Sequence, residues 1–110
     1  MYSKELLKGT LKTIILAQLK EHGRMYGYEI TQQVKTLSGG SIQLTEGALY
    51  PALHKLEKEG FLSTEKVNIG LRVRKYYTLT PKGKKASVDK LKELQAFFLS
   101  LQKVMNLTLE

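Results

Sequence analysis

Side chains suited to contacting nucleic acid lie together on one side of an expected helix that begins near Thr45. At about 100° per residue, the side facing away from the leucines of this helix carries Gly47, Pro51, His54 and Lys58, flanked by Tyr50 and Lys55. A tyrosine can donate its hydroxyl group to a phosphate, and histidine and lysine can reach base edges or the backbone. A glycine in the first turn leaves the free N–H groups of the helix open to a phosphate. The pattern therefore favours contact with duplex DNA.

Each of these residues alone also has an ordinary structural explanation. Gly47 can serve close packing, His54 can be a surface histidine, and Lys58 can simply be hydrated. Their occurrence on one face, at the start of a capped helix, is what favours a DNA contact over these alternatives.

The distribution of charge also indicates a polyanionic partner. The net charge is +8, and the segment from His54 to Lys85 holds nine basic and three acidic residues. Such a concentration favours nucleic acid or an anionic membrane, with a hydrated surface as the ordinary alternative. The basic residues expected to act together with the helix are Lys66, Arg72, Arg74 and Lys75.

Patterns typical of enzymes and metal sites do not occur in the sequence. The chain has no cysteine, and its two histidines, His22 and His54, are not spaced as zinc ligands on a helix. There is no nucleophile elbow, phosphate-binding loop or dinucleotide-binding fingerprint. We therefore expect no enzyme activity, no metal and no cofactor. The lack of cysteine, of a signal-peptide pattern and of an apolar run of about 18–20 residues predicts a cytoplasmic protein without membrane contact.

Three helices are expected in the first half of the chain and must position the polar face described above. Apolar residues at helical spacing predict them over residues 4–21, about 28–37 and 45–59. Thr45 is a good N-cap for the third helix, and Gly60 is a C-terminal stop.

The pattern changes to short β-prone runs after the third helix. Residues 61–67 and 73–79 predict two strands of a hairpin, separated by a turn segment that contains Asn68 and Gly70. A last helix is expected to start at Pro81, because proline is favoured at the first helical position. This order predicts an α+β, mostly α fold: a winged helix-turn-helix of three helices and a two-stranded wing, followed by a long C-terminal helix.

Pro51 falls inside the third expected helix, where proline removes a backbone hydrogen bond and crowds the preceding turn. Two explanations are open. Either the helix is kinked at Pro51, or its regular part begins near Tyr50.

The last helix carries an apolar stripe at heptad a and d spacing, formed by Leu91, Leu94, Phe98, Leu101 and Met105. We expect it to form a dimer interface, since a small core can cover little of such a stripe. The alternative is packing against the first helix within one subunit, and both can hold in part. One compact domain is thus expected to have two parts, a DNA-binding winged helix-turn-helix over residues 1–80 and a dimerisation helix over residues 81–110.

Three stretches resemble the signature blocks of the PadR family of transcriptional regulators. They are Met25-Tyr26-Gly27-Tyr28-Glu29-Ile30, the run from Thr45 to Gly60, and the run from Arg74 to Gly83. They occur in the order and at the spacing of the family. The family pattern includes a proline at the position of Pro51, which supports a real helix there. The single C-terminal helix is similar to that of the short-tailed branch.

The resemblance implies a homodimeric regulator, usually a repressor released by a small molecule, that binds an inverted-repeat operator on double-stranded DNA. It implies DNA contacts from the third helix and the wing, here Thr45, Glu46, Gly47, Tyr50, Pro51, His54, Lys55, Lys66, Arg72, Arg74 and Lys75. It implies dimerisation through the first and last helices, here Leu7, Leu11, Leu91, Leu94, Phe98, Leu101 and Met105.

A small aromatic effector is expected between the dimer halves, near Leu94, Phe97 and Phe98. In some relatives a tryptophan of the last helix holds planar aromatic drugs, whereas this chain has no tryptophan and Leu94 stands at the matching place. Two other functions stay open at this point. One is a winged helix that serves protein–protein assembly without DNA binding, and the other is RNA binding, although the tyrosine pairs do not form an RNP-like motif.

Overall fold

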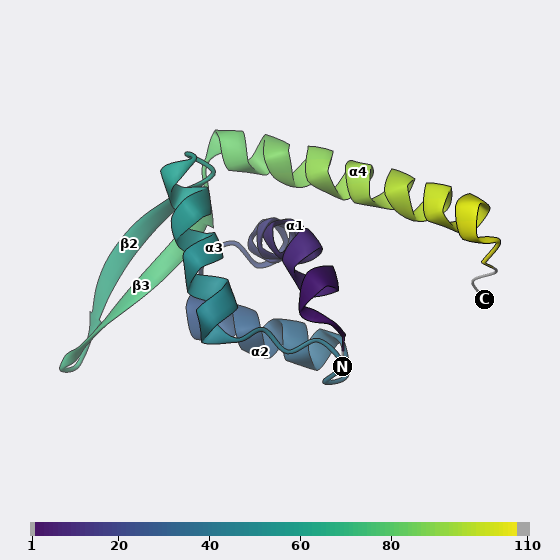
Figure 1. Cartoon of the computed structure of the whole chain (residues 1–110). Helices are drawn as coiled ribbons and strands as arrows, with labels where there is room; N and C mark the ends of the chain where they lie inside the picture. The colour runs from purple at the N-terminus through teal and green to yellow at the C-terminus, as the bar shows by residue number, and fades with distance from the viewer. Residues whose placement is uncertain (1, 108–110) are drawn as a thin grey trace.

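The computed structural model describes residues 2–107, which form four helices and a three-stranded antiparallel sheet. In chain order the elements are α1 (Lys4–His22), β1 (Met25–Tyr26), α2 (Gly27–Leu37), α3 (Glu46–Lys58), β2 (Leu62–Ile69), β3 (Arg72–Leu79) and α4 (Pro81–Met105). The predicted winged helix-turn-helix with a long last helix is confirmed. The β2–β3 hairpin, hereafter the wing, extends from one side of the helices and α4 extends from the other (Figure 1).

Side-chain hydroxyl groups mark where three of the helices begin. Ser3, Thr45 and Thr80 are the N-cap residues of α1, α3 and α4, and each accepts a hydrogen bond from a first-turn N–H group at 3.0–3.3 Å. These bonds satisfy donors that have no partner within the helix, and each typically stabilises a helix by about 1 kcal/mol. Thr45 is therefore the N-cap that the sequence predicted.

Pro51 lies inside α3, which runs without interruption from Glu46 to Lys58. The explanation that the regular helix begins only near Tyr50 is therefore wrong. Proline has no N–H group, so the carbonyl of Gly47 lacks its usual partner one turn later. Both Gly47 and Pro51 are exposed, and water can satisfy this carbonyl.

The sheet contains a third strand that the sequence pattern did not predict. In β1, Met25 and Tyr26 pair in antiparallel fashion with Tyr77 and Tyr76 of β3. The strand order is β1-β3-β2, so β3 is the central strand. Two residues are too few to show the alternation of apolar and polar side chains that reveals a strand.

The wing has longer strands and a tighter turn than expected. β2 continues to Ile69 and β3 begins at Arg72, and these two residues are paired across the ladder. Only Gly70 and Leu71 remain in the turn, where Gly70 has a φ of +61° that a two-residue hairpin turn requires. The prediction of a longer connection starting at Asn68 was therefore wrong, because Asn68 belongs to the ladder.

The hydrophobic core is formed by side chains from α1, α2, α3 and the sheet. The largest fully buried side chains are Ile15, Leu16, Leu19, Ile30, Leu49, Leu53 and Leu56. The leucines of α3 thus face the interior, and the opposite side of α3 is left free. None of the helices in residues 2–107 is long and apolar enough to cross a membrane.

The start of α4 is hydrogen-bonded to the chain that leaves α3. The N–H group of Thr80 donates to the carbonyl of Phe61 at 3.1 Å, and the Thr80 hydroxyl donates to the carbonyl of Gly60 at 2.7 Å. The Lys82 ammonium group donates to the carbonyl of Glu59 at 2.8 Å. These bonds fix the direction of α4 relative to α3.

Only the first turns of α4 are buried. Gly83 packs so closely on the carbonyl of Phe61 that a Cβ atom there would overlap it, and the Ser87 hydroxyl donates to the carbonyl of Leu16 at 3.3 Å. Farther along, α4 leaves the body of the protein, whose longest dimension is 54 Å (Figure 1). Exposed apolar side chains follow, namely Leu91, Phe97, Phe98, Leu99, Val104 and Met105. Residue 1 of the expected winged part and residues 108–110 of the expected dimerisation part lie outside the described residues.

Candidate nucleic-acid interface

A groove of about 860 Å³ lies between α3 and the wing. Its lining comes from α3, the sheet and the start of α2: Tyr26, Tyr28, Tyr50, His54, Ile69, Arg72, Val73, Arg74, Lys75 and Tyr77. The fold thus brings Tyr50 and His54 of α3 together with Arg72, Arg74 and Lys75 of β3. These are five of the residues predicted to contact DNA.

The other predicted residues lie beside this groove. Five are exposed on α3 or at its start, namely Thr45, Glu46, Gly47, Pro51 and Lys55. All of these except Glu46 also line a second groove, which α3 forms with α1. Lys66 is exposed on β2 and pairs with Lys75 across the ladder, so both side chains point to the same face of the wing.

The Tyr50 ring lies against the start of α2 at the position of a glycine, Gly27. A Cβ atom added to Gly27 would lie 2.6 Å from the Tyr50 hydroxyl oxygen and 2.8 Å from two atoms of its ring. Gly27 therefore leaves the space in which the Tyr50 ring lies at the edge of the groove. The sequence pattern did not predict this role, although Gly27 belongs to the Met25–Ile30 stretch described above.

Glu57 connects α3 to both strands of the wing. Its carboxylate accepts a hydrogen bond from the Thr64 hydroxyl at 2.9 Å and one from the Lys75 ammonium group at 3.3 Å. The bond from Thr64 and the charge of Lys75 lower the pKa of Glu57 against the opposing effect of partial burial. Lys75 also lies 5.4 Å from the centre of the Tyr77 ring, and burial raises the pKa of Tyr77. The spacing between α3 and the wing is therefore set in part by a carboxylate that was not predicted.

Two arginines and two tyrosines join the wing to β1. The Arg74 guanidinium group lies 4.0 Å from the centre of the Tyr26 ring, and Arg24 lies 4.1 Å from that of Tyr76. The two rings meet edge to face with their centres 5.5 Å apart. Arg74 also donates to the Tyr76 hydroxyl at 3.4 Å, and this bond raises the pKa of Arg74. Both charges are thus held by aromatic groups of the protein itself.

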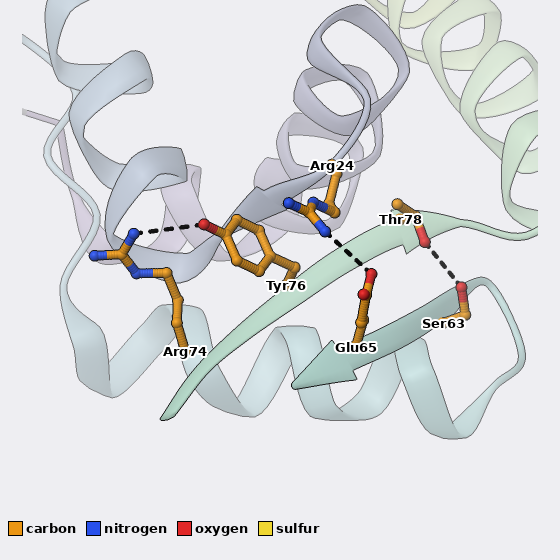
Figure 2. A network of polar contacts seen from close by, with 6 residues as sticks. All are labelled: Arg24, Ser63, Glu65, Arg74, Tyr76 and Thr78. Atoms are coloured by element: carbon orange, nitrogen blue, oxygen red, sulfur yellow. Dashed lines mark hydrogen bonds and ion pairs between the residues drawn. The ribbon is translucent and has the colours of Figure 1, made fainter. Parts of the chain in front are cut away.

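Figure 2 shows Tyr76 of β3 between Arg74 and Arg24. In the same view Arg24 reaches across to Glu65 of β2 in an ion pair of 3.1 Å, and Ser63 and Thr78 share a hydrogen bond of 2.9 Å across the ladder. Arg24 was not among the predicted site residues. It lies directly before β1 and contacts Glu65 of β2 and Tyr76 of β3, so it braces the base of the wing.

The cations of the interface differ in how free they are to bind a ligand. Lys75 is paired with Glu57, and Arg74 is stacked on Tyr26. Within residues 2–107, Lys66 and Arg72 take part in no ion pair and are exposed. Lys66 and Arg72 are therefore the wing cations most available to a phosphate.

A family model supports the interpretation of this fold. The model of the PadR-like family of transcriptional regulators matches residues 15–88, from the middle of α1 to the first turns of α4. The chain belongs to this family. The resemblance noted in the sequence is thereby confirmed, and the PadR-like region includes the whole groove between α3 and the wing.

Individual relatives are similar over most of the chain. The negative transcriptional regulator PadR of Bacillus subtilis is 37% identical over 80 residues, which are 72% of this chain and 43% of that protein. A solved protein of Streptococcus mutans is 35% identical with a TM-score of 0.76 and covers 100% of this chain and 98% of its own. A solved transcriptional regulator from Clostridium thermocellum has a TM-score of 0.82 at 28% identity and covers 94% of this chain and 97% of its own.

One solved PadR structure contains DNA. Bacillus subtilis PadR in complex with operator DNA is 33% identical to this chain with a TM-score of 0.66, over 82% of this chain and 58% of that one.

The side chains predicted for a dimer interface and an effector site lie at different depths in the single chain. Leu91, Phe97, Phe98 and Met105 of α4 are exposed, whereas Leu94 and Leu101 are half-buried. Leu7 of α1 is half-buried, and Leu11 belongs to the buried core of its own subunit. The exposed part of the predicted set therefore lies on α4.

Proposed function

We propose that this PadR-family protein is a sequence-specific DNA-binding regulator, with α3 in the major groove and the wing on the flanking backbone. The observation that carries the proposal is the groove that gathers Tyr50, His54 and Arg72 on one surface between α3 and the wing. Hydroxyl, imidazole and guanidinium groups are donors that bind phosphates and base edges. The relative from Bacillus subtilis whose structure was solved with operator DNA supports the same use of the fold here.

The functional unit in this proposal is a homodimer joined through α4, with the winged part over residues 1–80 and the dimer part over residues 81–110. On the a and d stripe, Leu91, Phe98 and Met105 are 39%, 51% and 58% exposed in the single chain. Burying such apolar surface is favourable by about 25 cal/mol per Å², and a second copy offers a matching stripe. A two-fold dimer presents two α3 helices to an inverted repeat whose half-site centres lie about one duplex turn, or a multiple of it, apart.

The dimer is proposed to act as a repressor that a small aromatic effector releases from DNA. The effector site lies near Leu94, Phe97 and Phe98, because two subunits meet there and the rings of Phe97 and Phe98 are exposed in the single chain. An effector weakens DNA binding only if it binds the DNA-free arrangement of the dimer more tightly than the DNA-bound one.

The test is binding to duplexes from a random pool at several salt concentrations, followed by footprinting on the selected sequences. A dimer that neutralises roughly 6–10 phosphates should lose affinity by about 10³–10⁵ between 50 and 200 mM salt. The selected sites should be inverted repeats that are protected symmetrically. An affinity independent of salt would favour protein–protein assembly instead, and asymmetric sites bound by monomers would contradict the dimer.

A further inference from the structure

A second groove, of about 690 Å³, lies between α1 and α3 on the other flank of α3. Aliphatic side chains dominate its surface: Leu7, Leu11, Leu44, Ala48, Pro51 and Ala52. Among the described residues that line it there is no aromatic side chain. The groove therefore offers a mainly aliphatic surface, in contrast to the tyrosine-rich groove beside the wing.

Four lysines surround this aliphatic surface. Lys4, Lys8 and Lys12 are spaced four apart on α1 and so form a row on one face of that helix, and Lys55 approaches from α3. Lys12 is paired with Glu59 at 3.1 Å. Within residues 2–107 the other three lysines have no acidic partner, so like charges repel one another along the groove.

The size and chemistry of the groove fit a small amphiphilic anion. Ligand sites usually have volumes of roughly 300–1,000 Å³, a mostly apolar lining and a few polar groups that fix the ligand. The phosphates of a duplex would account for the lysines but not for the aliphatic surface beneath them. We propose that the groove between α1 and α3 binds an aliphatic carboxylate, with the alkyl chain along Leu44, Ala48 and Ala52 and the carboxylate among Lys4, Lys8 and Lys55.

Such a ligand would act on the recognition helix directly. Gly47, Pro51 and Lys55 line the groove and also belong to the face of α3 assigned to DNA. A bound carboxylate neutralises positive charge beside that face, so ligand and DNA weaken each other by the same factor, about fivefold or more. This effect rests on the proposed function, whereas binding of the carboxylate itself does not. The site also differs from the aromatic effector site proposed on α4.

The first experiment titrates laurate into the full chain without DNA and follows binding by calorimetry. Laurate should bind at least tenfold more tightly than dodecyltrimethylammonium, which has the same chain and the opposite charge, and than acetate, which lacks the chain. Ala48→Met, which fills the groove, and Lys8→Gln, which removes a cation, should each weaken laurate binding at least fivefold. The matched controls are Ala96→Met and Lys20→Gln, at exposed positions outside the groove, and they should bind laurate as the parent chain does.

Several results would overturn the site. One is that Ala48→Met and Ala96→Met bind laurate with equal affinity. Another is that the chain binds the cationic amphiphile as tightly as laurate. A third is that laurate binds only after Leu101→Asp has made the chain monomeric. The last result would mean that a second copy covers the groove. A loss of DNA affinity in Lys8→Gln, with no laurate binding by the parent chain, would assign the lysines to duplex phosphates instead.

The second experiment measures affinity for the selected duplex with and without laurate. A drop of about fivefold or more supports the link to DNA, and an unchanged affinity with laurate bound refutes it. Failure of DNA binding without laurate would count against the proposed function alone, because the calorimetric titration contains no DNA.

Discussion

Gly27→Ala should lower the affinity of this protein for DNA while leaving its stability nearly unchanged. The three heavy atoms nearest to the added methyl group all belong to the Tyr50 side chain, whose hydroxyl oxygen would lie 2.6 Å from the new Cβ atom. Tyr50 is 44% exposed, so its ring can rotate into solvent and is not compressed. Gly27 is not among the glycines with positive φ, so its backbone accepts alanine. We expect the free energy of unfolding to change by less than about 1 kcal/mol, below the 1–3 kcal/mol of an overfilled core.

The affinity for DNA should change much more. A rotated Tyr50 loses its proposed hydrogen bond to a phosphate, which contributes about 1 kcal/mol in each subunit. Two subunits give about 2 kcal/mol, or about a 30-fold higher Kd for the dimer. Fluorescence anisotropy with the selected duplex measures this change, and chemical unfolding measures the stability of the same samples.

A double-mutant cycle tests the reasoning. If Gly27→Ala acts through the Tyr50 hydroxyl, adding Tyr50→Phe should cause almost no further loss of affinity. Gly9→Ala is the control, because nothing lies within 4 Å of the added Cβ atom on this exposed residue of α1. It should retain DNA affinity and stabilise the helix by up to about 1 kcal/mol. Additive losses in the double variant, or parental affinity in Gly27→Ala, would refute the proposed link between the two residues.

Three further predictions concern charge and assembly. Because the pKa of Glu57 is lowered in the folded state, its stabilising effect is present above the unfolded-state pKa and is lost as the pH falls through the folded-state pKa. Glu57→Gln should therefore reduce the acid-induced loss of stability in urea unfolding between about pH 3 and 7, and an unchanged pH profile would contradict this. Arg72→Ala should lower both DNA affinity and its salt dependence at unchanged thermal stability, whereas Arg74→Ala should also lower the melting temperature because it removes the stack on Tyr26. Equal melting temperatures for the two variants would argue against a structural role of that stack. Leu101→Asp should place an unpaired charge in the α4 stripe, so sedimentation should detect monomers and DNA binding should weaken. A dimer that survives this change would place the interface elsewhere.

Much of the helical framework could be predicted from the sequence because its signals are local. Thr45 and the leucines at 49, 53 and 56 lie within one segment, and together they determine where α3 begins and which side it buries. The face left for Tyr50, His54 and Lys55 follows from that geometry alone. The apolar spacing predicted a helix across Pro51 although its local effect opposes helix formation, and the family pattern supported that helix.

The parts that could not be predicted depend on contacts between distant segments. β1 exists only because Met25 and Tyr26 meet β3, about 50 positions later. Glu57 looks like an ordinary carboxylate of a charged helix until Thr64 and Lys75 are folded against it. Nothing within its own segment distinguishes such a residue from a hydrated one.

Helix α4 is long, and most of it extends beyond the body of the protein (Figure 1). The 18 residues that follow Ser87, at 1.5 Å each, extend about 27 Å beyond the buried first turns, so a tilt of about 5° at the base moves the tip by about 2 Å. At its base, hydrogen bonds join Thr80 and Lys82 to the carbonyls of Glu59, Gly60 and Phe61, directly after α3. A small change in the direction of α4 at its base would therefore be magnified at its tip.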